Sequence, residues 1–216
     1  MNKLEARNVC KHFKNRTIFE NINLEFDSGK IYGIVGPNGC GKSVLFKILS
    51  GLMQPNSGQI LYNEKELYKD IHILPSIGLV INDPQFYNYL SGYENLYILA
   101  SIKNLISEQD IINILEKIGL QNDKSKVKTY STGMKQRLAL AQAIMENPDV
   151  LILDEITNGI DKTGLNMVYD LLKQEKENGK IIIITSHRIQ DIKILCDEVY
   201  EIDNYGVNQI EKDDLV

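Results

Sequence analysis

The sequence of 216 residues lacks several features that mark particular classes of protein. It has no tryptophan and only three cysteines, Cys10, Cys40 and Cys196, which are scattered without the spacing of a metal site. No apolar run approaches the roughly 18–20 residues that cross a bilayer, and the first residues lack the apolar centre of a signal peptide. We therefore expect a cytosolic chain without disulfide bonds, in which Cys10 and Cys196 are small buried side chains.

The sequence also lacks an excess of basic residues. Its formal net charge is -5 at pH 7, whereas a protein that binds nucleic acid usually presents a basic surface. Nucleic acid is therefore not expected as a partner. The net charge does not exclude a local anion site, because backbone N–H groups at a helix N-terminus bind phosphate without basic side chains.

Strand-like and helix-like segments alternate along most of the chain. Apolar and polar residues alternate in "ENINLEF", which predicts a strand that is buried on one face. The runs "IYGIV", "VLIL" and "IIIIT" are apolar almost throughout, as expected of strands buried on both faces, and helical segments separate them. This order predicts an α/β fold with a mainly parallel central sheet.

The middle of the chain is predicted to be helical. Ser91 and Glu94 have capping-box spacing at the start of "SGYENLYILASI", and Ser107 begins a second helical segment that ends near Gly119. Spacing places the apolar residues of each helix on one face, which we expect to pack in the core. These residues are Tyr93, Leu96, Tyr97 and Ala100 in the first helix and Ile111, Leu115 and Ile118 in the second.

The segment "GPNGCGKS", here called the phosphate turn (Gly36–Ser43), lies between a predicted strand and a predicted helix. It matches G-x-x-x-x-G-K-[ST], in which glycines allow successive N–H groups to point at phosphate oxygens. Lys42 is expected to reach the β- and γ-phosphates, and the Ser43 hydroxyl is expected to bind Mg²⁺. The predicted nucleotide-binding residues are Gly36, Pro37, Asn38, Gly39, Cys40, Gly41, Lys42, Ser43 and Val44.

The thiol of Cys40 needs no part in this chemistry, because a small side chain suffices at its position. The alternative is a reactive thiol, since a helix N-terminus lowers the pKa of a nearby cysteine.

Polar side chains follow two other predicted strands. Asp154, at the end of "VLILD", is positioned to hold Mg²⁺ through water, and Glu155 is free to accept a proton from the attacking water. His187 ends "IIIITSH"; a polar residue that merely closes a strand is the alternative interpretation. Because the ends of parallel strands meet at one edge of a sheet, His187 is expected to contact the γ-phosphate. The predicted catalytic residues are Glu155, His187 and Lys42.

Five segments occur in a characteristic order: the phosphate turn, "YSTGMKQR", "LILDE", "NGID" and "SHRIQD". In this order the sequence resembles the ATP-binding cassette (ABC) ATPases, the motor subunits of ABC transporters, from about Leu4 to about Gly206. It is most similar to the bacterial export-type members. The resemblance implies a P-loop NTPase fold with a small antiparallel β subdomain and an inserted α-helical subdomain. The expected organisation is a single domain, residues 1–216, with its helical subdomain at approximately residues 84–145.

In this family two cassettes pair head to tail, and the signature of one closes the site that holds the other's ATP. The resemblance therefore implies ATP and Mg²⁺ as cofactors and a second copy, or a paralogous ATPase subunit, as a partner. It also implies that Phe13 stacks on adenine and that Asp161 lies in the loop that crosses the dimer. The signature residues implied to contact the partner's nucleotide are Ser131, Thr132, Gly133 and Met134.

The sequence departs from the family's pattern at several positions. Asn82 stands where a glutamine usually contacts Mg²⁺, with Gln85 as the alternative for that position. Thr132 replaces a signature glycine, Met134 a glutamine, and Ile156 a common proline. Hydrolysis is nevertheless expected, because the main catalytic residues are all present. The predicted Mg²⁺ ligands are Ser43, Asp154 and Asn82.

The resemblance implies an ATP-hydrolysing subunit that lies peripherally on the inner face of the cell membrane. It would dock on separate integral membrane subunits and drive transport, with export of a peptide, drug or bacteriocin as the expectation. Two alternatives remain at this point. One is a soluble non-transport ABC ATPase, and the other is a weakly hydrolysing regulatory module, suggested by Asn82 and the altered signature.

Overall fold

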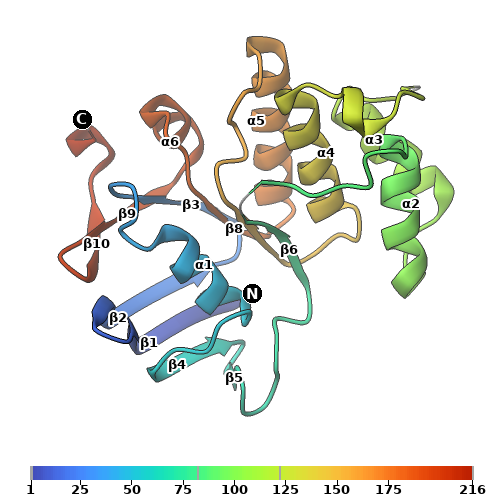
Figure 1. Ribbon diagram of the computed structural model, residues 1–216. Coiled ribbons are helices and arrows are strands. Elements are labelled where there is room, and N and C mark those ends of the chain that lie inside the picture. The colour runs from blue at the N-terminus through green and yellow to red at the C-terminus, as the bar shows by residue number, and fades with distance from the viewer. Residues whose placement is uncertain (1, 82, 122, 216) are drawn as a thin grey trace.

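The computed structural model describes residues 2–81, 83–121 and 123–215. A six-stranded sheet lies at its centre, and Figure 1 shows its place among the helices. In sheet order the strands are β10 (Gly206–Ile210), β9 (Glu198–Asp203), β3 (Lys30–Val35), β8 (Ile181–Ile184), β7 (Val150–Leu153) and β6 (Ile77–Val80). Neighbouring strands pair in parallel, except that β10 is antiparallel to β9. Strands β7 and β8 are buried on both faces, which explains their continuous apolar sequences. The predicted mainly parallel α/β fold is confirmed.

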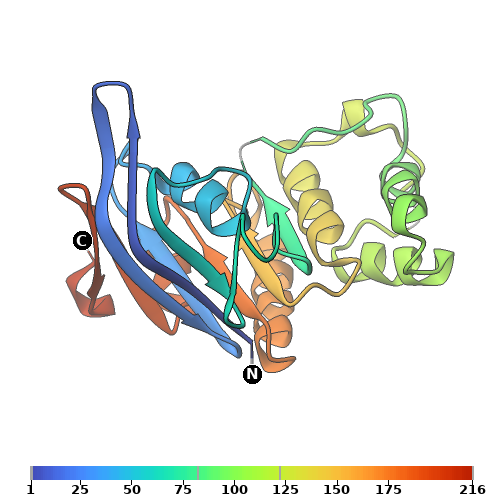
Figure 2. The same cartoon turned by 90° about the horizontal axis from the view of Figure 1, so that it is seen from below.

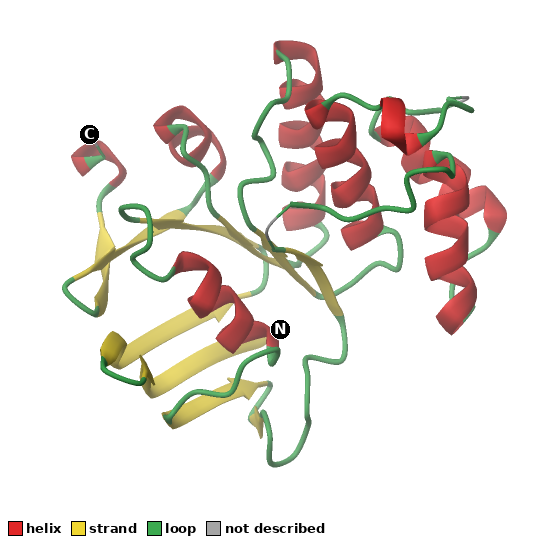
Figure 3. Ribbon diagram, in the orientation of Figure 1, coloured by secondary structure: helices red, strands yellow, loops and turns green. Residues whose placement is uncertain are grey.

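A second sheet consists of antiparallel strands from the first third of the chain (Figure 3). Its strands in sheet order are β2 (Arg16–Asp27), β1 (Lys3–Phe13), β4 (Ser57–Tyr62) and β5 (Lys65–Glu66). Ile22, Leu24 and Phe26 are buried and alternate with exposed residues, as the sequence pattern predicts. This sheet is the expected antiparallel β subdomain.

Helix α1 (Lys42–Ser50) packs between the two sheets. Its apolar residues Leu45, Phe46, Ile48 and Leu49 are fully buried and belong to one hydrophobic cluster with side chains from both sheets. The helix begins directly after the phosphate turn and ends at Gly51, which has a left-handed backbone conformation. The core therefore fixes the position of the helix N-terminus that follows the phosphate turn.

A group of helices projects from one side of the central sheet (Figure 2). Between β6 and β7 the chain forms α2 (Gly92–Lys103), α3 (Glu108–Lys117), the short 3-10 helix η1 (Val127–Thr129) and α4 (Thr132–Ile144). Helices α2 and α3 both begin with capping boxes, formed by Ser91 with Glu94 and by Ser107 with Asp110. The predicted helix starts therefore have the hydrogen bonds that their spacing indicates.

The remaining helices are α5 (Lys162–Glu177), α6 (Ile189–Leu195) and the 3-10 helix η2 (Lys212–Asp214). Helices α4, α5 and α6 contribute to a second hydrophobic cluster, which packs on the face of the central sheet opposite α1. Alternate residues of β7 and β8 supply the two clusters, as the pleat of a strand requires. No helix in the described ranges is long and apolar enough to span a bilayer.

Two sequence expectations about burial are wrong. The Tyr97 side chain, which we expect in the core, is 45% exposed and stacks on Tyr93, whereas Leu96 and Ala100 are buried. The reason is that the tyrosines lie at the edge of the apolar face of α2, outside the centre of its contact with the core. Cys10, expected to be buried, is only half-buried on β1, whereas Cys196 is 2% exposed.

Candidate functional site

The phosphate turn connects β3 to α1 and has a backbone that requires glycine at Gly41. The φ angle of Gly41 is 117°, and a Cβ atom there would lie 2.7 Å from Cγ2 of Ile18 and 2.9 Å from Cζ of Phe19. No side chain caps α1, because Gly41 itself is the N-cap residue. The first N–H groups of this helix are therefore left for a ligand, and its dipole favours an anion.

Lys42 lies across the phosphate turn. Its Nζ donates hydrogen bonds to the carbonyl oxygens of Gly36, at 2.7 Å, and Pro37, at 3.2 Å. The Nη2 of Arg16 donates to the Gly39 carbonyl oxygen at 2.8 Å, so the β1–β2 hairpin also holds the turn. The positive charge of Lys42 thus lies over the turn. A bound phosphate would replace the carbonyl oxygens as the acceptor of its hydrogen bonds.

Ser43 and Asp154 are distant in sequence but in direct contact. The Ser43 Oγ donates to Oδ2 of Asp154 at 2.7 Å, and the Thr185 Oγ1 donates to Oδ1 at 2.6 Å. The Asp154 carboxylate is buried at the end of β7, and Thr185 directly follows β8. A hydroxyl and a carboxylate at this place are hard oxygen ligands, so the donor set fits Mg²⁺ with water completing its coordination.

Glu155 and His187 also meet at the ends of neighbouring strands. Oε1 of Glu155 lies 2.6 Å from Nε2 of His187, and Nδ2 of Asn158 donates to Oε2 at 2.5 Å. The Glu155 backbone has a φ of 53°, and its N–H donates to the Thr185 Oγ1 at 2.9 Å. This left-handed turn directs Glu155 away from Asp154, so the adjacent carboxylates have different partners.

The segment "YSTGMKQR" forms the start of α4. The Ser131 hydroxyl accepts a hydrogen bond from the Met134 N–H at 3.2 Å, and both Ser131 and Thr132 are exposed. Gly133 is buried, because a Cβ atom there would lie only 2.7 Å from the carbonyl oxygen of Gly159. The start of this helix therefore presents side chains to solvent but packs its glycine against a loop of its own chain.

More than half of the chain matches a known protein family. Residues 19–158 match the family described as ABC transporter. The chain belongs to this family. It is 44% identical over 210 residues to the uncharacterized ABC transporter ATP-binding protein YybJ of Bacillus subtilis (strain 168), which covers 97% of this chain and 96% of YybJ. The predicted ATP-binding subunit of an ABC transporter, with its ATPase activity, is thus confirmed.

Two further relatives of this ABC ATPase have names that state a transported molecule. It is 39% identical over 195 residues to the lantibiotic transport ATP-binding protein SrtF of Streptococcus pyogenes, covering 90% of this chain and 84% of SrtF. It is 40% identical over 199 residues to the bacitracin transport ATP-binding protein BcrA of Enterococcus faecalis, covering 91% of this chain. The match spans 65% of the length of BcrA.

Solved structures share the fold of this ABC ATPase. One is an ATP-binding subunit of an ABC transporter, with a TM-score of 0.86 and 24% identity, covering 98% of this chain and 90% of the other. Another is a dimeric ATP-binding cassette in a post-hydrolysis state with ADP and phosphate, with a TM-score of 0.85 and 23% identity. It covers 97% of this chain and 98% of the other. These likenesses support the fold.

Two predicted site residues, Phe13 and Asp161, lie outside the central contacts. Phe13 is 43% exposed at the end of β1 and pairs with Arg16, the residue that holds the phosphate turn. Asp161 is the exposed N-cap of α5, and its Oδ1 accepts from the Gly164 N–H at 3.1 Å. Asn82 lies outside the described residues of this ABC ATPase.

Sequence reasoning missed two residues of the site, Thr185 and Asn158. Each stands in a quoted motif: Thr185 lies two residues before His187 in "IIIITSH", and Asn158 lies three residues before Asp161 in "NGID". Their proximity to the motifs was the available signal. The backbone conformation determines which polar side chains turn toward Asp154 and Glu155. The sequence motif does not specify that conformation.

Proposed function

We propose that this ABC ATPase binds Mg-ATP at the phosphate turn and hydrolyses it between the ends of β7 and β8. The uncapped N–H groups of α1 and the Nζ of Lys42 would bind the β- and γ-phosphates. Ser43 and Asp154 would hold Mg²⁺, which neutralises charge on the phosphate oxygens when bound. The observation that carries this proposal is the direct hydrogen bond between Ser43 and Asp154, because it brings two predicted Mg²⁺ ligands from distant motifs together.

Glu155 is the proposed general base, and His187 is its partner at the γ-phosphate. Oε1 of Glu155 lies 2.6 Å from Nε2 of His187, and Oε2 accepts a hydrogen bond from Nδ2 of Asn158. Both carboxylate oxygens of Glu155 therefore already face a nitrogen donor group. The attacking water must replace one of these donors before Glu155 can accept its proton, and His187 is then free to donate toward the phosphate.

A second cassette would complete the site. The phosphate turn covers one side of a triphosphate, and the exposed Ser131 and Thr132 of a partner are suited to bind the other side. The partner is a second copy of this chain or a paralogous ATPase subunit, arranged head to tail. We propose residues 1–216 as the single domain of each cassette, with Asp161 in the loop that faces the partner and Phe13 against adenine.

A surface beside the signature suits the membrane subunits. Tyr87 and Tyr89 are 63% and 73% exposed in the loop that precedes α2. Residues 83–86 and Asn88 line a cavity of about 310 Å³ together with Thr132, Lys135 and Gln136 at the start of α4. A membrane subunit bound to this loop would therefore contact the residues at the start of α4. We propose that it binds the helical subdomain, residues 84–145, on the inner face of the membrane.

The named relatives suggest the transported class. One is named for transport of a lantibiotic and one for transport of bacitracin. Since this chain covers most of the lantibiotic relative, we propose export of a peptide antibiotic or a related toxic peptide by separate membrane subunits. The class of transported peptide can be identified by testing which peptide raises the ATPase rate of the assembled transporter.

The test of the mechanism is Glu155→Gln, which keeps the shape of the side chain but removes the base. We expect ATP hydrolysis to fall by about three orders of magnitude, in the middle of the range for general-base catalysis. Mg-ATP binding should be retained, and the variant should run as a dimer in gel filtration with Mg-ATP but not with Mg-ADP.

Lys42→Ala is the matched control, because it should abolish binding and therefore dimer formation as well. Undiminished turnover by the Glu155→Gln variant would refute the role of Glu155. A variant that binds Mg-ATP at saturation yet stays monomeric would instead refute the shared site.

A further inference from the structure

A fully buried carboxylate lies beside the catalytic residues without taking part in the proposed chemistry. Asp191, on α6, is 0% exposed and follows His187 by one helical turn. A charged group in such a place is strongly unfavourable unless it is paired or hydrogen-bonded. The Tyr169 hydroxyl, from α5, donates to its Oδ1, and the Ser186 Oγ donates to its Oδ2 at 2.7 Å. Both carboxylate oxygens therefore have a hydroxyl donor.

The Ser186 hydroxyl extends this arrangement to both catalytic loops. It accepts a hydrogen bond from the Arg188 N–H at 3.0 Å, so it fixes the backbone on each side of His187. It also lies 3.1 Å from the Thr157 Oγ1, in the loop that follows Glu155. One hydroxyl thus joins the loop that carries His187 to the loop that carries Glu155.

An ion pair alone does not account for these contacts. The Nε of Arg188 lies 3.5 Å from Oδ1 of Asp191, but the Arg188 side chain is 43% exposed. Exposed pairs of this kind contribute little to stability, and an apolar residue would fill the same space at lower cost. The hydroxyl network holds the segment around His187 in a single backbone geometry. An apolar residue at position 191 could not do this.

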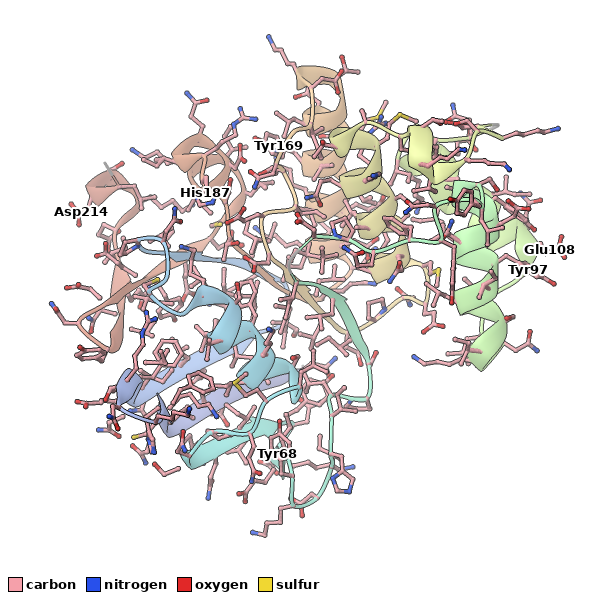
Figure 4. The ribbon with its side chains drawn as sticks, in the orientation of Figure 1. Tyr68, Tyr97, Glu108, Tyr169, His187 and Asp214 are labelled. Atoms are coloured by element: carbon pink, nitrogen blue, oxygen red, sulfur yellow. The ribbon has the colours of Figure 1, made fainter. Side chains whose placement is uncertain are left out.

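We propose that Asp191 is a positioning residue for ATP hydrolysis, which, with Tyr169 and Ser186, holds His187 at its contact with Glu155. Figure 4 labels Tyr169 and His187, the residues at the two ends of this arrangement. The inference rests on the roles proposed above for Glu155 and His187. It assigns a function to α5 as well, because Tyr169 lies on the helix that Asp161 caps. A movement of that helix start would reach His187 through Tyr169 and Asp191.

The hydroxyl of Tyr169 remains a hydrogen-bond donor near neutral pH. Burial, followed by the hydrogen bond to the Asp191 carboxylate, raises the pKa of Tyr169 to about 12. The phenol therefore stays protonated near neutral pH, and removing its hydroxyl leaves the buried Oδ1 without its hydroxyl donor. Tyr169→Phe makes this change without altering the shape of the ring.

The chain provides a closely matched control in Tyr62 on β4. Its hydroxyl donates to Oδ2 of Asp149 at 3.1 Å, and burial, followed by the charge of Asp149, raises the pKa of Tyr62 to about 12. Asp149 precedes β7, at the opposite end of that strand from Asp154. Tyr62→Phe therefore removes the same kind of hydrogen bond from the part of the sheet that carries no catalytic residue.

The experiment measures kcat, KM for ATP and the melting temperature of both variants and of the unaltered chain. For Tyr169→Phe we expect kcat to fall about ten-fold, which corresponds to about 1.4 kcal/mol of lost transition-state stabilisation. KM should stay within about two-fold, because the phosphate turn is untouched. The two variants should lower the melting temperature by similar amounts, because each loses one hydrogen bond to a carboxylate. Tyr62→Phe should nevertheless leave kcat within about two-fold. Equal effects on kcat, or no effect of Tyr169→Phe, would overturn the inference.

Ser186 gives a second test that does not depend on the tyrosine. Ser186→Ala should lower kcat as Tyr169→Phe does, and Ser186→Thr should restore it, because threonine keeps the hydroxyl. Failure of threonine to restore a kcat that alanine has lowered would count against the network. His187→Ala is measured in parallel. If the unaltered chain hydrolyses ATP and His187→Ala does not, the proposed role of His187 stands. An unchanged kcat in the Tyr169 and Ser186 variants then refutes only the positioning role of Asp191. Absence of hydrolysis by the unaltered chain would refute the proposed function and this inference together.

Discussion

The phosphate turn and the signature both lead into a helix N-terminus, but the two helices begin differently. Helix α1 has Gly41 as its N-cap and no side chain that accepts from its first N–H groups. Helix α4 has Ser131, whose hydroxyl accepts from the Met134 N–H. The first helix therefore leaves its donors for a ligand, whereas the second satisfies one of them within its own chain.

In the shared site that we propose, this difference would give the two halves unequal roles. The phosphate turn supplies a backbone cradle together with the charge of Lys42, so it can bind an anion alone. The signature offers a capped helix and exposed side chains, and its glycine is packed beneath Gly159. It is suited to complete an existing site, and any change at Gly133 must also affect the loop that precedes Asp161.

The largest expected effect comes from filling the space at the uncapped helix. Gly41→Ala places a Cβ atom within 2.7 Å of Ile18 at a φ of 117°, so the turn must distort. We expect the affinity for ATP to fall at least about 100-fold, as overpacking of about 3 kcal/mol implies. Isothermal titration calorimetry with Mg-ATP measures this change.

Gly179→Ala is the control for strain alone. Its φ is 82°, yet nothing lies within 4 Å of the added Cβ atom. ATP affinity should be unchanged in this variant. Equal losses in both variants would mean that backbone strain, rather than the space at the phosphate turn, explains the result for Gly41.

A smaller effect is expected at the capped helix. In Gly133→Ala the Cβ atom would meet the Gly159 carbonyl oxygen at 2.7 Å, which displaces the start of α4. We expect turnover to fall about 30-fold, or about 2 kcal/mol. The affinity of one chain for ATP should change little, because the phosphate turn belongs to the other side of the site. A parallel loss of affinity and turnover would contradict the division between the half-sites.

The smallest expected effect separates the capping role of Ser131 from its role toward a partner. Ser131→Ala and Ser107→Ala each remove an N-cap hydroxyl, at α4 and α3, and each should cost about 1 kcal/mol of stability. Ser131→Ala alone should also lower turnover about ten-fold, through loss of one hydrogen bond to the partner's nucleotide. Thermal melts and ATPase assays compare the two variants, and equal turnover in both would show that Ser131 acts only as a cap.

The local parts of the fold follow from the sequence because short-range chemistry determines them. The glycine pattern and Lys42 predict the phosphate turn, and paired capping residues predict the starts of α2 and α3. The continuous apolar runs predict buried parallel strands, since only strands covered on both faces are apolar throughout.

The unpredicted parts depend on contacts between distant segments. Periodicity places Tyr97 on the apolar face of α2, but it does not reveal where the neighbouring helix stops covering that face. The burial of Gly133 depends on a loop 26 residues later, and the partners of Asp191 come from two other elements. No local pattern specifies which of several polar side chains turns inward at a strand end.

Because α1 is buried between the two sheets, nucleotide binding should stabilise both sheets as well as the phosphate turn. The amides that we propose to bind phosphate belong to the same helix whose side chains join both sheets. A ligand at 100 times its Kd adds about 2.7 kcal/mol to the stability of the state that binds it. Saturating nucleotide should therefore slow amide hydrogen exchange far into the sheets, while the projecting helices α2 and α3 keep the exchange rates of the empty protein.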